Sequence, residues 1–173
     1  RPSTTLEGLS GLRPVFREEG RVTAGNACPL NDGAAACVVM SGRRARDLGI
    51  QPRARIVATS VSAVDPTIMG IGPVKATQRV LDAAGMTIDD VDRVELNEAF
   101  AAQVIPSQQQ LGLAHERLNV RGGALALGHP FGMTGARLVT TLLHILEDED
   151  QEVGLATLCV GGGQGMSLLL QRV

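Results

Sequence analysis

The chain of 173 residues carries a formal net charge of −2, and 44% of its residues are hydrophobic although it has three Phe and no Trp or Tyr. A chain of this size can bury a substantial core, which must then consist of Ala, Val and Leu. The small negative charge argues against a nucleic-acid-binding surface, and no apolar run approaches the roughly 18 residues of a membrane-spanning helix. Cys28, Cys37 and Cys159 show no paired spacing, which is typical of a reducing compartment such as the cytoplasm.

The first fifty residues are predicted to form a loop, one buried strand and a short helix. Residues 1–31 are rich in glycine and proline, which favours loop with brief extended pieces. The unbroken apolar run 34–40 predicts a strand buried on both faces, with Cys37 as a core residue. Ser41 and Gly49 are placed to begin and to end a short basic helix.

From residue 51 onward, strand and helix patterns alternate. The predicted strands span 55–61, 91–96 and 119–127, followed by a hairpin of 153–160 and 165–172. The predicted helices run from Pro73 to Gly85, from about Glu98 to Leu111 with an interruption at Pro106, and over 134–147. The order βαβαβαββ predicts an α/β fold, with a mixed, mostly parallel five-stranded sheet and helices on its faces.

A glycine-rich corner joins the two strands of the predicted hairpin. Cys159 lies two residues before the first of three consecutive glycines, Gly161 to Gly163. Glycine leaves backbone N–H groups open to a substrate, so a thiol beside them is a candidate proton carrier next to an oxyanion site. From this segment alone, a small buried cysteine before a structural turn is the favoured interpretation.

Two further apolar runs end on a polar side chain. His129 stands between Gly128 and Pro130, in a glycine-rich loop before a strongly helical segment. Asn97 follows the predicted strand 91–96, where it is either a helix N-cap or an amide that holds a water or a carbonyl. A single histidine at a strand end is more often structural, but reactive side chains at several strand ends favour one common site.

The chain contains three motifs whose order and spacing resemble the C-terminal half of the thiolases, the acyl-CoA acetyltransferases: Asn97-Glu-Ala-Phe-Ala, Gly128-His-Pro and Cys159-x-Gly-Gly-Gly. Three flanking segments resemble the thiolase segments before that half, and they begin at Arg1, Thr23 and Asn31. The resemblance covers essentially the whole chain and implies three parts. These are the tail of the loop domain that covers coenzyme A (1–31), the last strand and helix of an N-terminal thiolase domain (32–50) and the C-terminal thiolase domain (51–173).

The resemblance implies acyl transfer between acyl-CoA and acetyl-CoA, as Claisen condensation or as thiolytic cleavage of a 3-ketoacyl-CoA. It implies that His129 activates a nucleophilic cysteine and then helps to bind the thioester oxygen, together with a water held by Asn97. Cys159 would take the α-proton of acetyl-CoA, and its surroundings must bring the pKa of the thiol toward neutral pH for this role. Amide donors near Cys159 and Gly161 suit the acyl-enzyme oxyanion.

The resemblance also implies contacts with the rest of the substrate. The expected residues lie near the nucleotide phosphates, along the pantetheine arm and near the acyl pocket, and they are Arg1, then Phe16, Ala24, Ala27 and Cys28, then Met69 and Phe100. Cys28 stands where many family members have serine, and a thiol is a poorer hydrogen-bond partner. Coenzyme A thioesters are expected as substrates, with no tightly bound cofactor and no metal.

The nucleophilic cysteine of thiolases belongs to their N-terminal half, and neither Cys28 nor Cys37 lies in a matching motif. We therefore expect the chain alone to be inactive, and the full enzyme to be a homodimer or homotetramer. Without neighbouring strands, the run 34–40 should leave residues 1–50 self-associated or without stable order, while 51–173 keeps a folded core. The alternatives are a non-catalytic coenzyme A-binding or assembly module and a condensing enzyme of the ketoacyl-synthase type, which the Cys159 motif disfavours.

Overall fold

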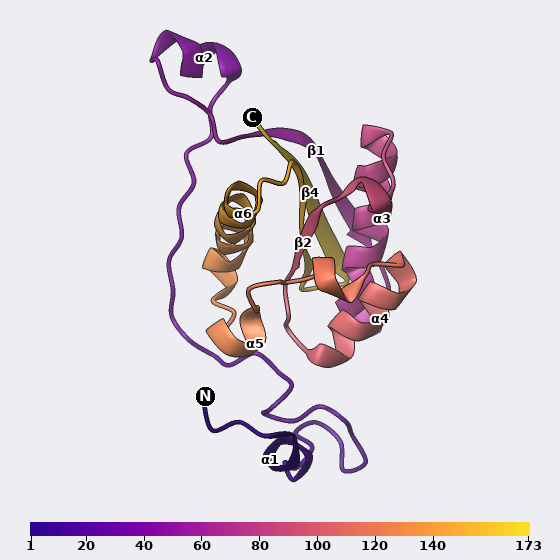
Figure 1. Cartoon of the computed structure of the whole chain (residues 1–173). Helices are drawn as coiled ribbons and strands as arrows, with labels where there is room; N and C mark the ends of the chain where they lie inside the picture. The colour runs from indigo at the N-terminus through magenta and orange to yellow at the C-terminus, as the bar shows by residue number, and fades with distance from the viewer.

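A computed structural model describes all 173 residues and contains one sheet with helices on both faces (Figure 1). Its strands are β1 (Ala54–Ala63), β2 (Arg93–Leu96), β3 (Val153–Val160) and β4 (Gln164–Arg172), in the order β1-β4-β3-β2. The pair β2–β3 is parallel, whereas β3–β4 and β1–β4 are antiparallel. The predicted mixed α/β sheet is confirmed. It has four strands rather than the predicted five, and one of its three strand pairings is parallel.

Three longer helices cover the sheet. They are α3 (Gly72–Ala84), α4 (Ala101–Leu111), which continues through Pro106, and α6 (Phe131–Asp148). The shorter elements are α1 (Leu6–Ser10), α2 (Gly42–Asp47), η1 (Pro66–Ile71), η2 (Ile88–Asp90), η3 (His115–Arg117) and α5 (Ala124–Leu127). None of the helices combines the length and the apolar character needed to cross a membrane.

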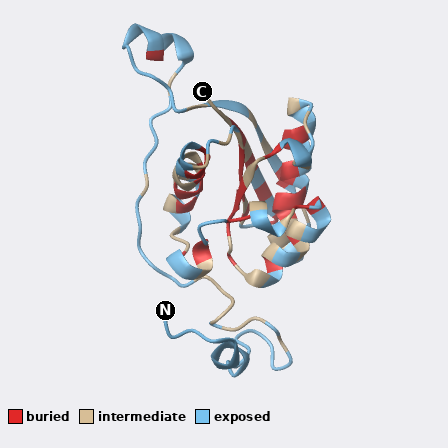
Figure 2. Ribbon diagram, viewed as in Figure 1, coloured by how far each residue is buried: buried red, intermediate tan, exposed pale blue.

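The core lies on both faces of the sheet (Figure 2). On the face under α3 and α4, buried Val and Leu side chains form the larger cluster, which includes Val80, Leu96 and Leu155. On the other face, Leu138, Leu142 and Leu146 repeat along α6 and pack against Ala156 and Leu170. The expected small aliphatic core is therefore present, and it holds the ends of β2 and β3 in fixed positions.

The predicted strand over 119–127 is wrong. At that edge of the sheet a single parallel bridge joins Val94 to Leu118. Directly after the bridge, Asn119 adopts a positive φ of 46°, and Gly122 follows with 77°. Extended pairing cannot continue through these two left-handed residues, and the following Ala-Leu-Ala-Leu run, which has high helix propensity, forms α5.

The predicted buried strand over 34–40 is not formed in the 173-residue chain. These residues form neither strand nor helix, and Val38 is 86% exposed. The segment passes alongside α6 (Figure 1), where Cys37 Sγ lies 3.9 Å from the Ala136 carbonyl oxygen. A strand needs a neighbouring strand for its N–H and C=O groups, and none of the four strands pairs with this run.

Candidate active site

The carboxyl ends of β2 and β3 bring Asn97 and Cys159 to one edge of the sheet. The two strands are parallel, and Leu96 stands opposite Thr157 in their register. One residue further, the Asn97 N–H donates to the Thr157 carbonyl at 3.0 Å. Cys159 follows two residues later, so the structure places two of the three predicted catalytic side chains at the edge where ligands bind in such sheets.

The side-chain amide of Asn97 has no hydrogen-bond partner within the protein. The N-cap of α4 is Phe100, so Asn97 does not cap that helix. Asn97 is completely buried, and neither its amide oxygen nor its amide nitrogen has a partner within the protein. Buried amides are almost always hydrogen-bonded, so this geometry favours the interpretation that Asn97 binds a water or a carbonyl.

Cys159 is buried at the start of the glycine corner. Gly162 and Gly163 adopt positive φ values of 85° and 87°, which form the tight turn between β3 and β4. Burial raises the pKa of the Cys159 thiol, and the nearby Cys28 raises it further, against a backbone hydrogen bond that lowers it. The thiol is therefore protonated near neutral pH. The groups around it in these 173 residues do not lower its pKa toward neutral pH. Gly161 is exposed at the same turn, where its carbonyl accepts from Gln164 Nε2 at 3.5 Å.

His129 lies half-buried at the beginning of α6. Its Nδ1 atom is 2.6 Å from Thr134 Oγ1, and its ring packs edge-on against Phe131 with centroids 4.9 Å apart. Burial lowers the pKa of His129, and the positive charge of Arg137 lowers it further. The imidazole is thus neutral at neutral pH and able to accept a proton. An open cavity of about 430 Å³ adjoins it, lined by Leu30, Asn31, Asp32, His129, Pro130 and Phe131.

The predicted pantetheine segment lies beside Asn97. The Cys28 N–H donates to Ala99 at 3.1 Å, the Ala101 N–H donates to Asn26 at 2.9 Å, and Ala27 forms a bridge with Phe100. The rings of Phe16 and Phe100 meet edge-on at 6.0 Å. Phe16, Ala27, Cys28 and Phe100 are therefore grouped next to the strand ends. Burial raises the pKa of the Cys28 thiol, so Cys28 is uncharged there.

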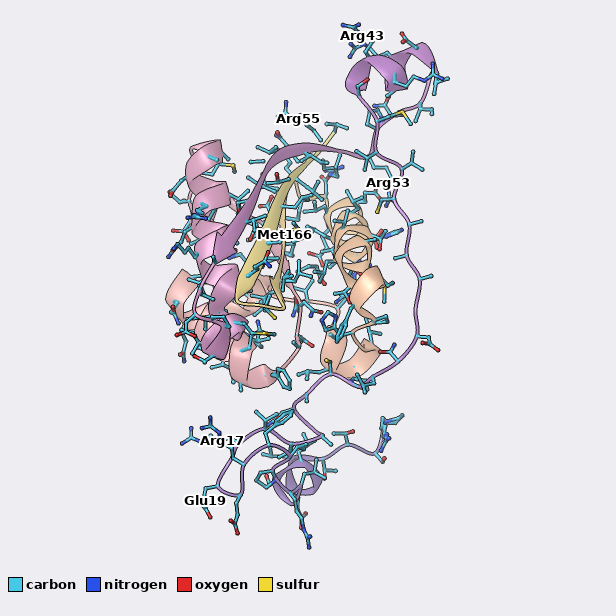
Figure 3. The ribbon with its side chains drawn as sticks, turned by 180° about the vertical axis from the view of Figure 1, so that it is seen from behind. Arg17, Glu19, Arg43, Arg53, Arg55 and Met166 are labelled. Carbon is cyan, nitrogen blue, oxygen red and sulfur yellow. The ribbon has the colours of Figure 1, made fainter.

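The remaining predicted contacts are more dispersed. Met69 is half-buried in η1, next to Gly70, which packs closely against Gln103 of α4. Ala24 is exposed in a turn, and Arg1 is exposed at the N-terminus. The neighbouring loop carries Arg17 and Glu19 at its tip, directed away from the sheet (Figure 3). The structure does not bring Arg1 or Ala24 to the strand ends.

A buried ion pair near the site was not predicted. Arg137 of α6 donates from Nη1 to Glu95 Oε2 of β2 at 2.9 Å, and both residues are buried. Burial raises the pKa of Glu95 to about 7, although Arg137 opposes the shift. One feature of the sequence points to this pair. Glu95 lies within a predicted strand, and a carboxylate that a helix covers needs a charged or hydrogen-bonding partner.

Comparison with known proteins agrees with this geometry. The family model "Thiolase, C-terminal domain" matches residues 50–172, and "Thiolase, N-terminal domain" matches residues 1–43. The chain is 54% identical to a 3-ketoacyl-CoA thiolase of Aeromonas salmonicida (strain A449) over 100% of the chain and 46% of that protein. It is 54% identical to an acetyl-CoA acetyltransferase of Pseudomonas aeruginosa PAO1 over 99% of the chain and 44% of that protein.

Two solved structures extend the comparison. The acetyl-CoA acetyltransferase of Bacillus anthracis superposes with a TM-score of 0.98 at 48% identity, covering 100% of this chain and 44% of the other. Human mitochondrial 3-ketoacyl-CoA thiolase in complex with CoA gives 0.94 at 44% identity, with the same two coverages. The chain spans about half the length of the curated relatives it matches. On sequence, fold and the placement of its three motifs, the chain belongs to the thiolase family.

Proposed function

We propose that the chain is the C-terminal part of an acyl-CoA:acetyl-CoA C-acyltransferase, which condenses acetyl-CoA units or cleaves a 3-ketoacyl-CoA by thiolysis. The observation that carries the proposal is the edge of the sheet where the unpartnered amide of Asn97 lies next to β3, which carries Cys159 near its end. The thiolase and acetyltransferase relatives support this reaction type. Residues 1–31, 32–50 and 51–173 then serve as loop-domain tail, end of the N-terminal domain and C-terminal domain.

His129 acts as the base of the first half-reaction. Its lowered pKa keeps the ring neutral, so it can accept the proton of a nucleophilic thiol as that thiol attacks the acyl-CoA. The same ring then donates to the thioester oxygen together with a water held by Asn97, while amide donors near Cys159 and Gly161 bind the acyl-enzyme oxyanion.

Cys159 carries the proton in the second half-reaction. It takes the α-proton of acetyl-CoA during condensation and returns a proton to the α-carbon during thiolysis. Its raised pKa keeps the thiol in the protonated form that the second direction requires, whereas the first requires further stabilisation of the thiolate. The nucleophile and its surroundings, which this chain does not contain, are the proposed source of that stabilisation.

The substrates are coenzyme A thioesters. The pantetheine arm lies along residues 26–28, which pair with residues 99–101, and the human relative was solved with CoA bound. Phe100 and Met69 border the acyl end. The three free cysteines fit a reducing compartment, which we take to be the cytoplasm. In the complete enzyme residues 34–40 pair with the strands of the N-terminal half, and the assembly is a homodimer or homotetramer.

Single substitutions in a protein extended by a thiolase N-terminal half test the roles. Cys159→Ala should still form the acyl-enzyme but should lose α-proton exchange from acetyl-CoA by about 10²–10⁴-fold. His129→Ala should also impair acylation, and Asn97→Ala should have a milder effect. Cys37→Ala, at a cysteine outside the proposed site, is the matched control and should leave both steps unchanged. Normal proton exchange in Cys159→Ala would show that Cys159 is a structural residue and not the base.

The isolated chain provides a second test. With acetyl-CoA and a short-chain acyl-CoA it should show neither condensation nor thiolysis, because its cysteines are Cys28, Cys37 and Cys159 and none serves as the nucleophile. Turnover that survives removal of contaminating enzyme would overturn this assignment. If the extended protein binds coenzyme A but does not turn over, the assembly-module alternative is correct instead.

A further inference from the structure

Asn119 holds the backbone on both sides of Leu96, directly before Asn97. Its Oδ1 atom accepts from the Leu96 N–H and its Nδ2 atom donates to the Leu96 carbonyl, both at 2.8 Å. The Asn119 N–H itself donates to Val94 at 2.9 Å. Asn119 is 9% exposed and has a positive φ, a conformation that asparagine tolerates better than most residues. One side chain thus replaces the missing neighbouring strand at the end of β2.

Glu98 joins this anchor to the segment that leads to His129. One carboxylate oxygen accepts from Asn119 Nδ2 at 2.8 Å, and the other accepts from the Leu125 N–H at 3.1 Å. The carboxylate lies so close to Gly123 that a Cβ there would stand 2.6 Å from Glu98 Oε2. It therefore occupies the N-terminus of α5, which begins five residues before His129.

Internal hydrogen bonds make the segment from Asn119 to His129 stiff. Gly122 N–H donates to the Asn119 carbonyl at 2.7 Å, the Leu127 N–H donates to Gly123 at 3.0 Å, and the Gly128 N–H donates to Ala124 at 2.8 Å. A shift at Asn119 or Glu98 is consequently transmitted to Gly128 and His129.

We propose that Glu98 and Asn119 are positioning residues that set the placement of His129 relative to Asn97. The inference rests on the proposed function, in which the His129 ring and a water held by Asn97 donate to the same thioester oxygen. Asn97 stands between Leu96, held by Asn119, and Glu98, which holds α5. The hydrogen-bonded pair of Asn119 and Glu98 thus fixes the backbone at Asn97 and the segment that leads to His129.

NMR titration of the three histidines in the 173-residue chain tests the proposal without turnover. In wild type the pKa of His129 lies below its ordinary value of 6.5 because the ring is packed against its surroundings. In Glu98→Ala the segment from Gly123 to Gly128 should swing outward, and the pKa of His129 should rise toward 6.5. Glu116→Ala, at an exposed glutamate, is the matched control and should leave the titration of His129 unchanged.

Exchanging the two functional groups separates positioning from stability. Asn119→Asp alone sets two carboxylates against each other and should raise the pKa of His129 as Glu98→Ala does. The double variant Glu98→Gln, Asn119→Asp restores the contact between residues 98 and 119, because the new amide donates to the new carboxylate while its oxygen still accepts from the Leu125 N–H. It does not restore the bond to the Leu96 carbonyl, because a carboxylate has no N–H to donate. The pKa of His129 should therefore fall part of the way back relative to Asn119→Asp alone. Glu98→Gln alone keeps the Leu125 bond and breaks only the contact with Asn119, so it is the milder variant to use if Glu98→Ala does not fold.

Turnover gives an independent readout. In the extended protein, Glu98→Ala should lower kcat by about 10²-fold with little change in KM, since misplacement of reacting groups acts on the chemical step. The double variant should recover part of the loss. An unchanged His129 titration in folded Glu98→Ala and Asn119→Asp, or a double variant no better than the single ones, overturns the positioning role. If the variants shift the His129 titration but the extended wild-type protein shows no turnover, the positioning role stands and the proposed function is rejected.

Discussion

Thr134 fixes which ring nitrogen of His129 carries the proton. Its Oγ1 atom lies 2.6 Å from His129 Nδ1 and 3.0 Å from the Pro130 carbonyl oxygen. A hydroxyl has one proton, and the carbonyl can only accept, so both contacts are hydrogen bonds when Thr134 donates to Pro130 and accepts from Nδ1–H. The neutral ring is then unprotonated at Nε2, which is the nitrogen available as a base.

Replacing Thr134 by valine should release this control. In Thr134→Val the neutral His129 ring should become a mixture of tautomers, detected by the ¹⁵N chemical shifts of the two ring nitrogens. Thr140→Val on the same helix, whose hydroxyl bonds only the Arg137 carbonyl, should leave His129 in the Nδ1–H form. An unchanged tautomer in Thr134→Val would show that the ring is oriented by its other contacts, such as Phe131.

Glu95 should make the chain less stable as pH rises through neutrality. Its pKa is raised from 4.5 to about 7, so the folded state binds the proton more tightly than the unfolded state. The stability that protonation contributes is complete below about pH 4.5 and is lost as pH rises through about 7, an effect on the order of 3 kcal/mol.

Glu95→Gln should remove that dependence, because glutamine keeps the shape of the protonated acid and does not titrate. Urea unfolding of both proteins at pH 5 and pH 8 measures it, and the difference between the two proteins cancels the other titrating groups. The free energy of unfolding of wild type should fall relative to Glu95→Gln over this range. A constant difference would mean that Glu95 remains ionised at both pH values, stabilised by Arg137.

Gly165 is required by the contact between α3 and the glycine corner. A Cβ on Gly165, which pairs with Cys159 across the hairpin, would collide with the backbone of Gly72 at the start of α3. Gly165→Ala should therefore lower the free energy of unfolding by about 1–3 kcal/mol. Gly132→Ala, which meets no atom within 4 Å inside α6, should be neutral or stabilising by up to about 1 kcal/mol. Equal stability of the two variants would show that α3 moves away without cost.

Residues 34–40 should exchange their amide protons rapidly in this chain. None of their N–H groups donates to a backbone carbonyl, whereas 54–63 and 153–172 are paired within the sheet. Hydrogen exchange followed by mass spectrometry should show fast exchange over 34–40 and slow exchange over the strands. Strong protection of 34–40 in a demonstrated monomer would contradict both this expectation and the proposed pairing with an N-terminal half.

Local patterns in the sequence determined the elements whose hydrogen bonds lie close along the chain. The hairpin was predicted within one residue of its strands, and Gly85 ends α3 with a positive φ as its position indicated. The three motifs also sufficed to identify the family, because each consists of contiguous residues and their order is independent of how they pack.

Only the tertiary structure decided what depends on distant partners. Residues 34–40 have the composition of a buried strand, but a strand exists only where another supplies its hydrogen bonds. Asn97 has the position of a helix cap, yet burial between β2 and β3 left its amide free. The contacts of Arg137 with Glu95 and of Glu98 with Leu125 join residues 42 and 27 positions apart, so no local pattern predicts them. Packing of α6 and α5 against the end of β2 creates these contacts, and with them the placement and charge state of His129.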